Sequence, residues 1–186
     1  MHIKIFKLFT GIALLSVVYI SLTFDNNPIQ DDNKILWSKT KLTWDDFMGI
    51  RPSDMSDIVA AEIKGSIEIV DVPMKNNIPR PVVHCYFVKD QSWTKVNTAT
   101  ALAHEQLHFD IYEMFARKIR KSFVVMNRKK VSDFNEYQKV YSQLIKECIV
   151  YNDLYDNQVY FNDIQQRNWI KKVTAELEKL KAYENL

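Results

Sequence analysis

The residues with the clearest chemical potential are His104, Glu105 and His108, which lie within the five-residue sequence His-Glu-Gln-Leu-His. Histidines four residues apart face the same side of an α-helix, with Cβ atoms about 5 to 6 Å apart, so their imidazoles can bind one zinc ion. Glu105 is turned too far round the helix to be a third ligand, but its carboxylate can reach a metal-bound water. The spacing therefore predicts a zinc site at His104 and His108, with Glu105 as the general base.

The same helical wheel predicts how the neighbouring residues are distributed. At about 100° per residue the histidines share a face with apolar side chains, namely Ala101, Leu107, Ile111, Tyr112, Phe115 and Ile119. Gln106, Asp110, Glu113 and Arg117 are expected on the opposite, polar face, and solvent exposure is the simplest expectation for Asp110. Two core histidines bonded to ordinary polar groups are the alternative to a metal. We favour the metal, because buried imidazoles need partners and zinc serves two at once.

A zinc site needs a third protein ligand and leaves the fourth position to water. Asp110 and Glu113 are expected to face away from the histidine pair, so the ligand must come from another segment. His84, in a predicted strand, is one candidate. The stretch 147–160 offers three acidic candidates, Glu147, Asp153 and Asp156. It also carries three tyrosines that are expected either to bind an oxyanion or, more simply, to pack between helices: Tyr151, Tyr155 and Tyr160.

An α+β domain is expected to position these residues. Alternating apolar and polar side chains predict a strand over 61–69 and a second over 82–89 that pairs with it, joined by a connection at 70–81. From Thr98 onward, helical periodicity predicts helices over 98–120, 133–156 and 163–183. Strands followed by helices favour a small antiparallel sheet that packs on the histidine helix and two further long helices.

The N-terminal segment has the pattern of an export signal. Lys4 and Lys7 precede an apolar run at 8–24, close to the roughly 17 residues that can span a bilayer. Residues 1–24 therefore predict either a cleaved signal peptide or an uncleaved membrane anchor, and residues 25–34 a linker. We expect a domain at 35–186 that is exported, either periplasmic or secreted, and attached to the inner membrane if the anchor is kept.

Composition narrows the class of protein. The chain has 186 residues, of which 47% are hydrophobic and 26% charged, and a formal net charge of +2, as in one ordinary globular domain. Removing Lys4 and Lys7 leaves the domain near neutrality, which argues against a nucleic-acid partner. The basic residues at 117–130 predict a solvated helix end, with contact to anionic membrane as the alternative. Cys85 and Cys148 are expected either to form one disulfide or to be separately buried.

Three further sequence blocks lie in order along the chain. The first is Leu-Thr-Trp-Asp-Asp-Phe-Met-Gly at 42–49, the second is a strand containing Phe87 followed by Ser92-Trp93, and the third is Ala-His-Glu-Gln-Leu-His-Phe-Asp-Ile at 103–111. Together they resemble an uncharacterised bacterial family of secreted zinc-dependent proteases within the H-E-x-x-H zincin superfamily. The resemblance covers nearly the whole domain and implies a zincin-like fold.

A fourth block of that family, in which Tyr-Asp is followed by Thr and then His, is kept in part. Tyr155 and Asp156 are present, but Val159 stands where the family has Thr and Phe161 where it has His. If the family's aspartate is the third zinc ligand, the resemblance implies that Asp156 completes the site. If the histidine is that ligand, the resemblance implies weak zinc binding or no catalysis.

The expected function is therefore that of a zinc metallopeptidase. Zn²⁺ is expected at His104, His108 and Asp156, with His84, Asp153 and Glu147 as alternatives to Asp156, and Glu105 is expected to promote hydrolysis of a peptide or protein substrate. The rival expectation is a catalytically inactive zincin scaffold that acts as a binding or structural module in the envelope. A third is zinc-dependent hydrolysis of another amide, such as a cell-wall peptide cross-link.

Overall fold

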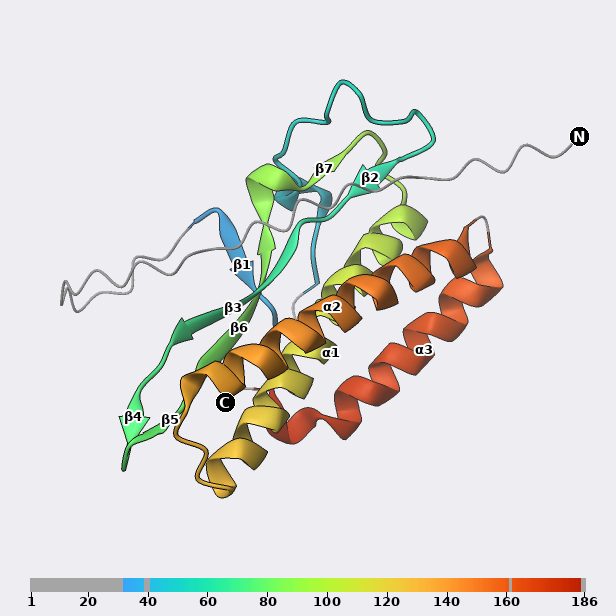
Figure 1. Cartoon of the computed structure of the whole chain (residues 1–186). Coiled ribbons are helices and arrows are strands. Elements are labelled where there is room, and N and C mark those ends of the chain that lie inside the picture. Colours follow the sequence, from blue (N-terminus) through green and yellow to red (C-terminus); the bar gives the residue numbers. More distant parts are fainter. Residues whose placement is uncertain (1–31, 39–40, 161, 185–186) are drawn as a thin grey trace, which may run out of the picture. The chain divides into compact units, whose positions relative to one another are not determined.

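The longest element of the protein is helix α1, Ala99–Arg128 (Figure 1). The Thr98 side chain caps its start by accepting a hydrogen bond from the backbone N–H of Ala101. No glycine or proline interrupts it, and it ends eight residues beyond the predicted position 120. The computed structural model describes residues 32–38, 41–160 and 162–184. The predicted export segment and most of the predicted linker, at 1–24 and 25–34, lie outside these ranges.

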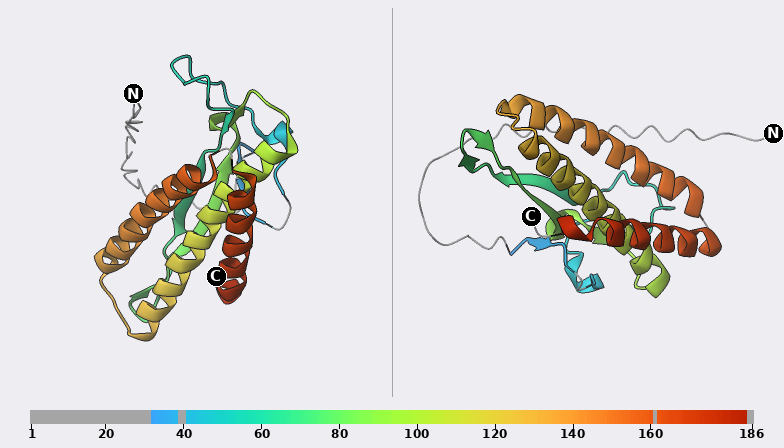
Figure 2. Two further views of the ribbon diagram at one scale, coloured as in Figure 1. Left: turned by 90° about the vertical axis from the view of Figure 1, so that its right-hand side faces the viewer. Right: turned by 90° about the horizontal axis from the view of Figure 1, so that it is seen from below.

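Helices α2, Phe134–Val159, and α3, Asp163–Lys179, both pack against α1 and against each other. Asp133 and Asn162 cap their N-termini through side-chain oxygens. Both predicted helices are confirmed, although the last predicted turn of the third becomes a separate 3₁₀ helix, η3, Lys181–Tyr183. Figures 1 and 2 show α1 lying between the sheet and α3, with α2 alongside it.

The main sheet has three antiparallel strands in the order β1-β6-β3. Strand β1 is Lys34–Leu36, β3 is Gly65–Asp71 and β6 is Val82–Val88. The predicted pairing of the two longer strands is confirmed, with Ile67 opposite Cys85. The predicted strand at 61–69 is interrupted, because β2, Ala61–Glu62, leaves the main sheet and pairs with β7, Trp93–Thr94.

The predicted connection at 70–81 contains a hairpin of its own. Strand β4, Met74–Lys75, pairs with β5, Ile78–Pro79. The two residues between them, Asn76 and Asn77, have φ values of 53° and 60°. Two successive positive φ angles match the twist of a tight hairpin, and asparagine tolerates them better than most residues.

The core lies between the sheet and α1 and continues between the helices. Val83, Cys85 and Phe87 of β6 are completely buried, as their shared face predicts. Helix α1 approaches the sheet so closely that a Cβ atom on Gly65 would lie 2.3 Å from the Tyr112 ring. The fold is therefore α+β with small antiparallel sheets and three long helices in the described ranges, as the sequence predicts.

The predicted solvent-facing side of α1 is wrong. Gln106, Asp110, Glu113 and Arg117 are all buried, with at most 8% of each residue exposed. The segment before the 3₁₀ helix η1, Trp44–Asp46, packs on this side: Trp37 Nε1 donates to Asp110 at 3.0 Å, and the backbone N–H of Leu42 donates to Gln106 at 2.8 Å. Helix α1 is thus enclosed on two opposite sides.

A charged cluster on the same side of α1 ties three layers together. Arg117 and Arg120 each donate to Glu113 Oε1 at 2.9 Å, and all three side chains are almost fully buried. Arg120 also donates to Val83 O of the sheet, and Arg117 donates to Leu177 O of α3. The predicted solvated helix end is therefore wrong for these two arginines, because Glu113 and backbone carbonyls satisfy their guanidinium groups.

The two cysteines and Phe47 lie in the packed interior. Cys85 and Cys148 are both buried free thiols, which agrees with the second of the two expectations. Phe47 packs edge-on against Phe87. A Cβ atom on Gly49 would lie 2.8 Å from the backbone oxygen of Ser92, so this close approach requires glycine. None of the helices in the described ranges is long and apolar enough to cross a membrane.

Candidate metal centre

Helix α1 places the two histidines as their spacing predicts. His104 and His108 lie on successive turns, and their Nε2 atoms are 3.1 Å apart. His108 is the more deeply enclosed, with 10% of its side chain exposed against 25% for His104. The Nε2 atoms of both histidines therefore point at the same place, close to the protein surface.

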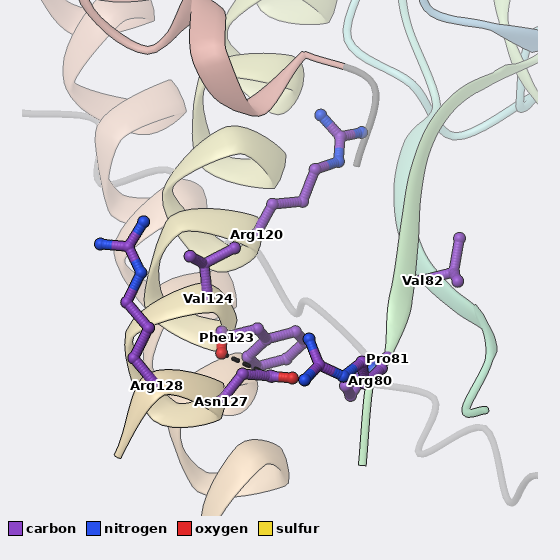
Figure 3. A pocket seen from close by; sticks show the side chains of 8 residues that line it. All are labelled: Arg80, Pro81, Val82, Arg120, Phe123, Val124, Asn127 and Arg128. Atoms are coloured by element: carbon purple, nitrogen blue, oxygen red, sulfur yellow. Dashed lines mark hydrogen bonds between the residues drawn. The ribbon is translucent and has the colours of Figure 1, made fainter. Parts of the chain in front are cut away.

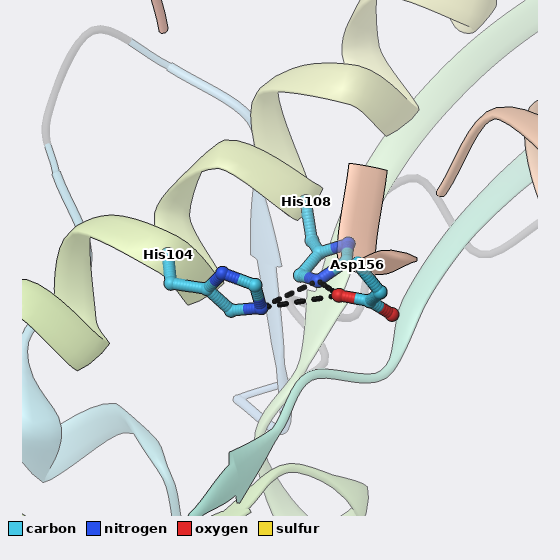
Figure 4. Close-up of side chains that lie close together, drawn as sticks. All are labelled: His104, His108 and Asp156. Atoms are coloured by element: carbon cyan, nitrogen blue, oxygen red, sulfur yellow. Dashed lines mark hydrogen bonds and ion pairs between the residues drawn. The ribbon is translucent and has the colours of Figure 1, made fainter. Parts of the chain in front are cut away.

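Asp156 of α2 supplies an oxygen atom at the same point. Its Oδ1 lies 2.9 Å from His108 Nε2 and 3.2 Å from His104 Nε2 (Figure 4). In the described part of the chain this is the one group of three His, Cys, Asp or Glu side chains close enough to share a metal ion. The Asp156 side chain is 54% exposed, so the group opens toward solvent on the α2 side.

The other predicted ligands lie outside this group. His84 is on β6, where its Nδ1 is 2.8 Å from the hydroxyl oxygen of Tyr86. Glu147 accepts a hydrogen bond from Gln143 on the exposed side of α2. Asp153 is exposed, three residues before Asp156 on the same helix. The structure therefore brings Asp156, and none of its three alternatives, to the histidine pair.

Asn152 orients His108, a role that the sequence analysis missed. Its Oδ1 lies 2.7 Å from His108 Nδ1, while its Nδ2 donates to Cys148 O at 2.9 Å. The second bond fixes which end of the amide faces the ring, so Nδ1 carries the proton and Nε2 is directed at Asp156. The four-residue spacing of Asn152 and Asp156 places both on one face of α2, a signal that the sequence does contain.

Tyr155 forms the wall of the site. Its ring stacks on His104 with centroids 4.8 Å apart and an interplanar angle of 24°, and it meets His108 edge-on. Its hydroxyl lies 3.4 Å from the backbone oxygen of His104. Tyr151 packs against Phe115 and Trp169. For these two tyrosines the packing interpretation is therefore the better one.

Glu105 is buried beside the group with 5% of the residue exposed. Its carboxylate has no hydrogen bond or ion pair within the described ranges. Burial raises the pKa of Glu105, while the charges of His108 and His104 act in the opposite direction. The Glu105 oxygens are not among the fully enclosed side-chain atoms that lack a hydrogen-bond partner, so they keep contact with solvent beside the histidines. A raised pKa suits a group that accepts and returns a proton.

The charges of the three clustered side chains depend on one another. Burial opposes the charged form of His108, but the hydrogen bond and charge of Asp156 outweigh it and raise the pKa of His108 to about 9. Burial likewise opposes ionisation of Asp156, but hydrogen bonds with His104 and His108 hold its pKa well below the usual range. In the metal-free protein at neutral pH, a proton on His108 therefore balances the Asp156 carboxylate.

The donor set fits zinc. Two imidazole nitrogens and one carboxylate oxygen are common ligands of catalytic zinc, which retains a fourth position for water. Ligand atoms at about 2.0 to 2.1 Å from zinc and at tetrahedral angles lie about 3.3 Å from one another. The observed separations of 2.9, 3.1 and 3.2 Å are close to that value, so small side-chain movements would suffice to bind the ion.

Comparisons with models of protein families, with curated proteins and with solved structures find no match to this chain. The metal centre is therefore inferred from the chain's own residues.

Proposed function

We propose that the protein is a zinc-dependent peptidase with a zincin-like fold. The observation that carries the proposal is the convergence of His104, His108 and Asp156 on one point, with the buried and unpartnered carboxylate of Glu105 beside it. A structural histidine pair requires hydrogen-bond partners but no such glutamate. Hydrolysis by an activated water requires both features.

In this proposal the side chains have separate tasks. His104, His108 and Asp156 hold Zn²⁺, which when bound lowers the pKa of a water molecule to about 7 and polarises a carbonyl group. Glu105 accepts a proton at its carboxylate from the attacking water and donates that proton to the leaving amine. Asn152 and Tyr155 keep the two imidazoles in position. The exposed side of Asp156 and His104 leaves room for a peptide chain to approach from solvent.

Metal analysis of the purified protein tests the binding half of the proposal. We expect one zinc ion per wild-type chain and less than one tenth of that in His104→Ala and Asp156→Asn. His84→Ala is the matched control, because His84 lies outside the group, and it should keep the ion. Full zinc occupancy in His104→Ala, or no zinc in the wild type after incubation with Zn²⁺, would refute the assignment.

Hydrolysis of a mixed peptide library tests the catalytic half. Glu105→Gln keeps the size of the side chain but cannot accept a proton, so it should retain zinc and lose activity by roughly 100-fold or more. Unchanged hydrolysis in this variant would exclude Glu105 as the base. Zinc-loaded wild-type protein that cleaves nothing would instead support the inactive envelope scaffold, which the sequence favours through Phe161, a residue outside the described ranges.

A further inference from the structure

A hollow lies far along α1 from the histidines, between the last turns of this helix and the start of β6 (Figure 3). Its volume is about 380 Å³, within the range of sites for small ligands. The residues that line it are Arg80, Pro81, Val82, Arg120, Phe123, Val124, Asn127 and Arg128. At 1.5 Å per residue, 16 to 24 helical residues from His104 correspond to roughly 24 to 36 Å.

The lining of this Arg80–Arg128 pocket includes three arginines and no acidic residue. Arg120 is neutralised, because it pairs with Glu113 and donates to the carbonyl oxygens of Val83 and Tyr183. Arg80 and Arg128 are exposed, and neither has an acidic partner within the described ranges. Their two positive charges therefore lie at the edge of the pocket without an acidic partner.

The floor of the pocket is apolar. Phe123 is 3% exposed, and Val124 and Pro81 complete the surface, whereas Figure 3 shows the Val82 side chain directed away from α1. Figure 3 shows Arg80 and Arg128 on opposite sides of Phe123 and Asn127. A ligand that fits this arrangement has a compact anionic head that two guanidinium groups can approach, together with a short apolar body that covers the floor.

We propose that the Arg80–Arg128 pocket binds a phosphate group carried on an alkyl body. Phosphate presents several oxygens around one centre, so it can accept hydrogen bonds from two guanidinium groups on different elements at once. Such a group occurs in soluble phosphomonoesters and in the head groups of anionic lipids. The exposed Lys121, Lys129 and Lys130 at this end of α1 add positive potential that attracts either source.

Titration of the whole chain with hexyl phosphate, followed by calorimetry, tests the pocket with a soluble ligand. We expect saturable one-to-one binding that is weakened roughly tenfold or more in Arg80→Gln/Arg128→Gln, because charge-assisted hydrogen bonds are lost. Val124→Trp, which fills the floor and keeps every charge, should weaken it similarly. Arg167→Gln, an exposed arginine of α3, is the matched control and should bind like the wild type.

Vesicles of phosphatidylglycerol and of phosphatidylcholine distinguish the two sources. Hexyl phosphate binding identifies a soluble ligand as sufficient. The lipid head group is the ligand if the protein prefers phosphatidylglycerol vesicles but does not bind hexyl phosphate. This preference should then be lost in both Arg80→Gln/Arg128→Gln and Val124→Trp. Equal losses in Lys129→Gln/Lys130→Gln and in the arginine variant would show a diffuse charge effect and overturn the pocket, as would no binding to either probe. His104→Ala, which removes the proposed zinc, should leave these results unchanged.

Discussion

Replacing Asn152 with leucine tests whether the amide prepares His108 for metal. Leucine has nearly the same volume but no acceptor, so the His108 Nδ1–H that now points at Oδ1 from 2.7 Å loses its partner in a site where Asn152 is only 8% exposed. Loss of the group that hydrogen-bonds the second ring nitrogen of a metal-binding histidine typically weakens metal binding by about 10- to 100-fold. We expect the lower end, about tenfold or 1.4 kcal/mol, because a neutral amide orients the ring but lends it no charge.

Competition with a chromophoric zinc chelator gives the dissociation constants, and urea unfolding of the metal-free proteins gives their stabilities. The unpaired Nδ1–H should also lower the free energy of unfolding of the metal-free variant, by about 1 to 3 kcal/mol. Asn157→Leu, at an exposed position of the same helix, is the control for the change of residue type. A zinc affinity within twofold of wild type in folded Asn152→Leu would show that Asn152 has only a packing role.

Three other predictions follow from contacts in the fold. The pKa of His108 in the metal-free protein is raised to about 9, so its proton stabilises that form fully below its ordinary value of about 6.5 and this contribution is lost as pH rises through 9. Zinc must displace this proton from His108, so calorimetry in buffers of different ionisation enthalpy should show proton release at pH 7. The affinity for zinc should also rise with pH up to about 9. Zinc binding without proton release would contradict the His108–Asp156 pairing. Glu113→Gln leaves two buried arginines undercompensated, and we expect it to lower the free energy of unfolding by about 3 to 5 kcal/mol in urea titrations, whereas the exposed Glu136→Gln should change it by less than about 0.5 kcal/mol; equal effects would mean that the cluster is hydrated. Gly65→Ala places a Cβ atom 2.3 Å from the Tyr112 ring, so thermal unfolding should show a loss of about 1 to 3 kcal/mol, and a neutral result would mean that helix and sheet can separate at no cost.

The sequence predicts how His104, Glu105 and His108 lie relative to one another well, because their geometry is local. The positions of His104, Glu105 and His108 relative to one another follow from one helix, and a helix without glycine or proline has a single dominant conformation. Asp156 is harder, because its place depends on how α2 packs on α1. The four-residue spacing places Asn152 and Asp156 on one face of α2, but only the 2.7 Å distance from Asn152 Oδ1 to His108 Nδ1 distinguishes Asn152 from a packing residue.

The second side of α1 shows where periodicity fails. A helical wheel assumes that a polar face meets water, whereas Asp110 and Glu113 meet Trp37, Lys41 and two arginines. Trp37 and Lys41 come from a segment far away in sequence, so the local residue pattern of α1 does not predict these contacts. For the same reason the predicted helix is too short. Arg117 and Arg120 resemble the basic residues that commonly end a helix, but both pair with Glu113 inside a helix that continues to Arg128.

The two buried thiols can be used to measure how often parts of this fold open. Burial raises the pKa of Cys85, and that of Cys148 rises to about 12, so neither sulfur can react with an alkylating reagent while the domain is closed. Cys85 belongs to the sheet and Cys148 to α2, and mass spectrometry can distinguish the two modified peptides. The rate at which each sulfur is modified therefore reports how often its own layer opens, without any label being engineered into the chain.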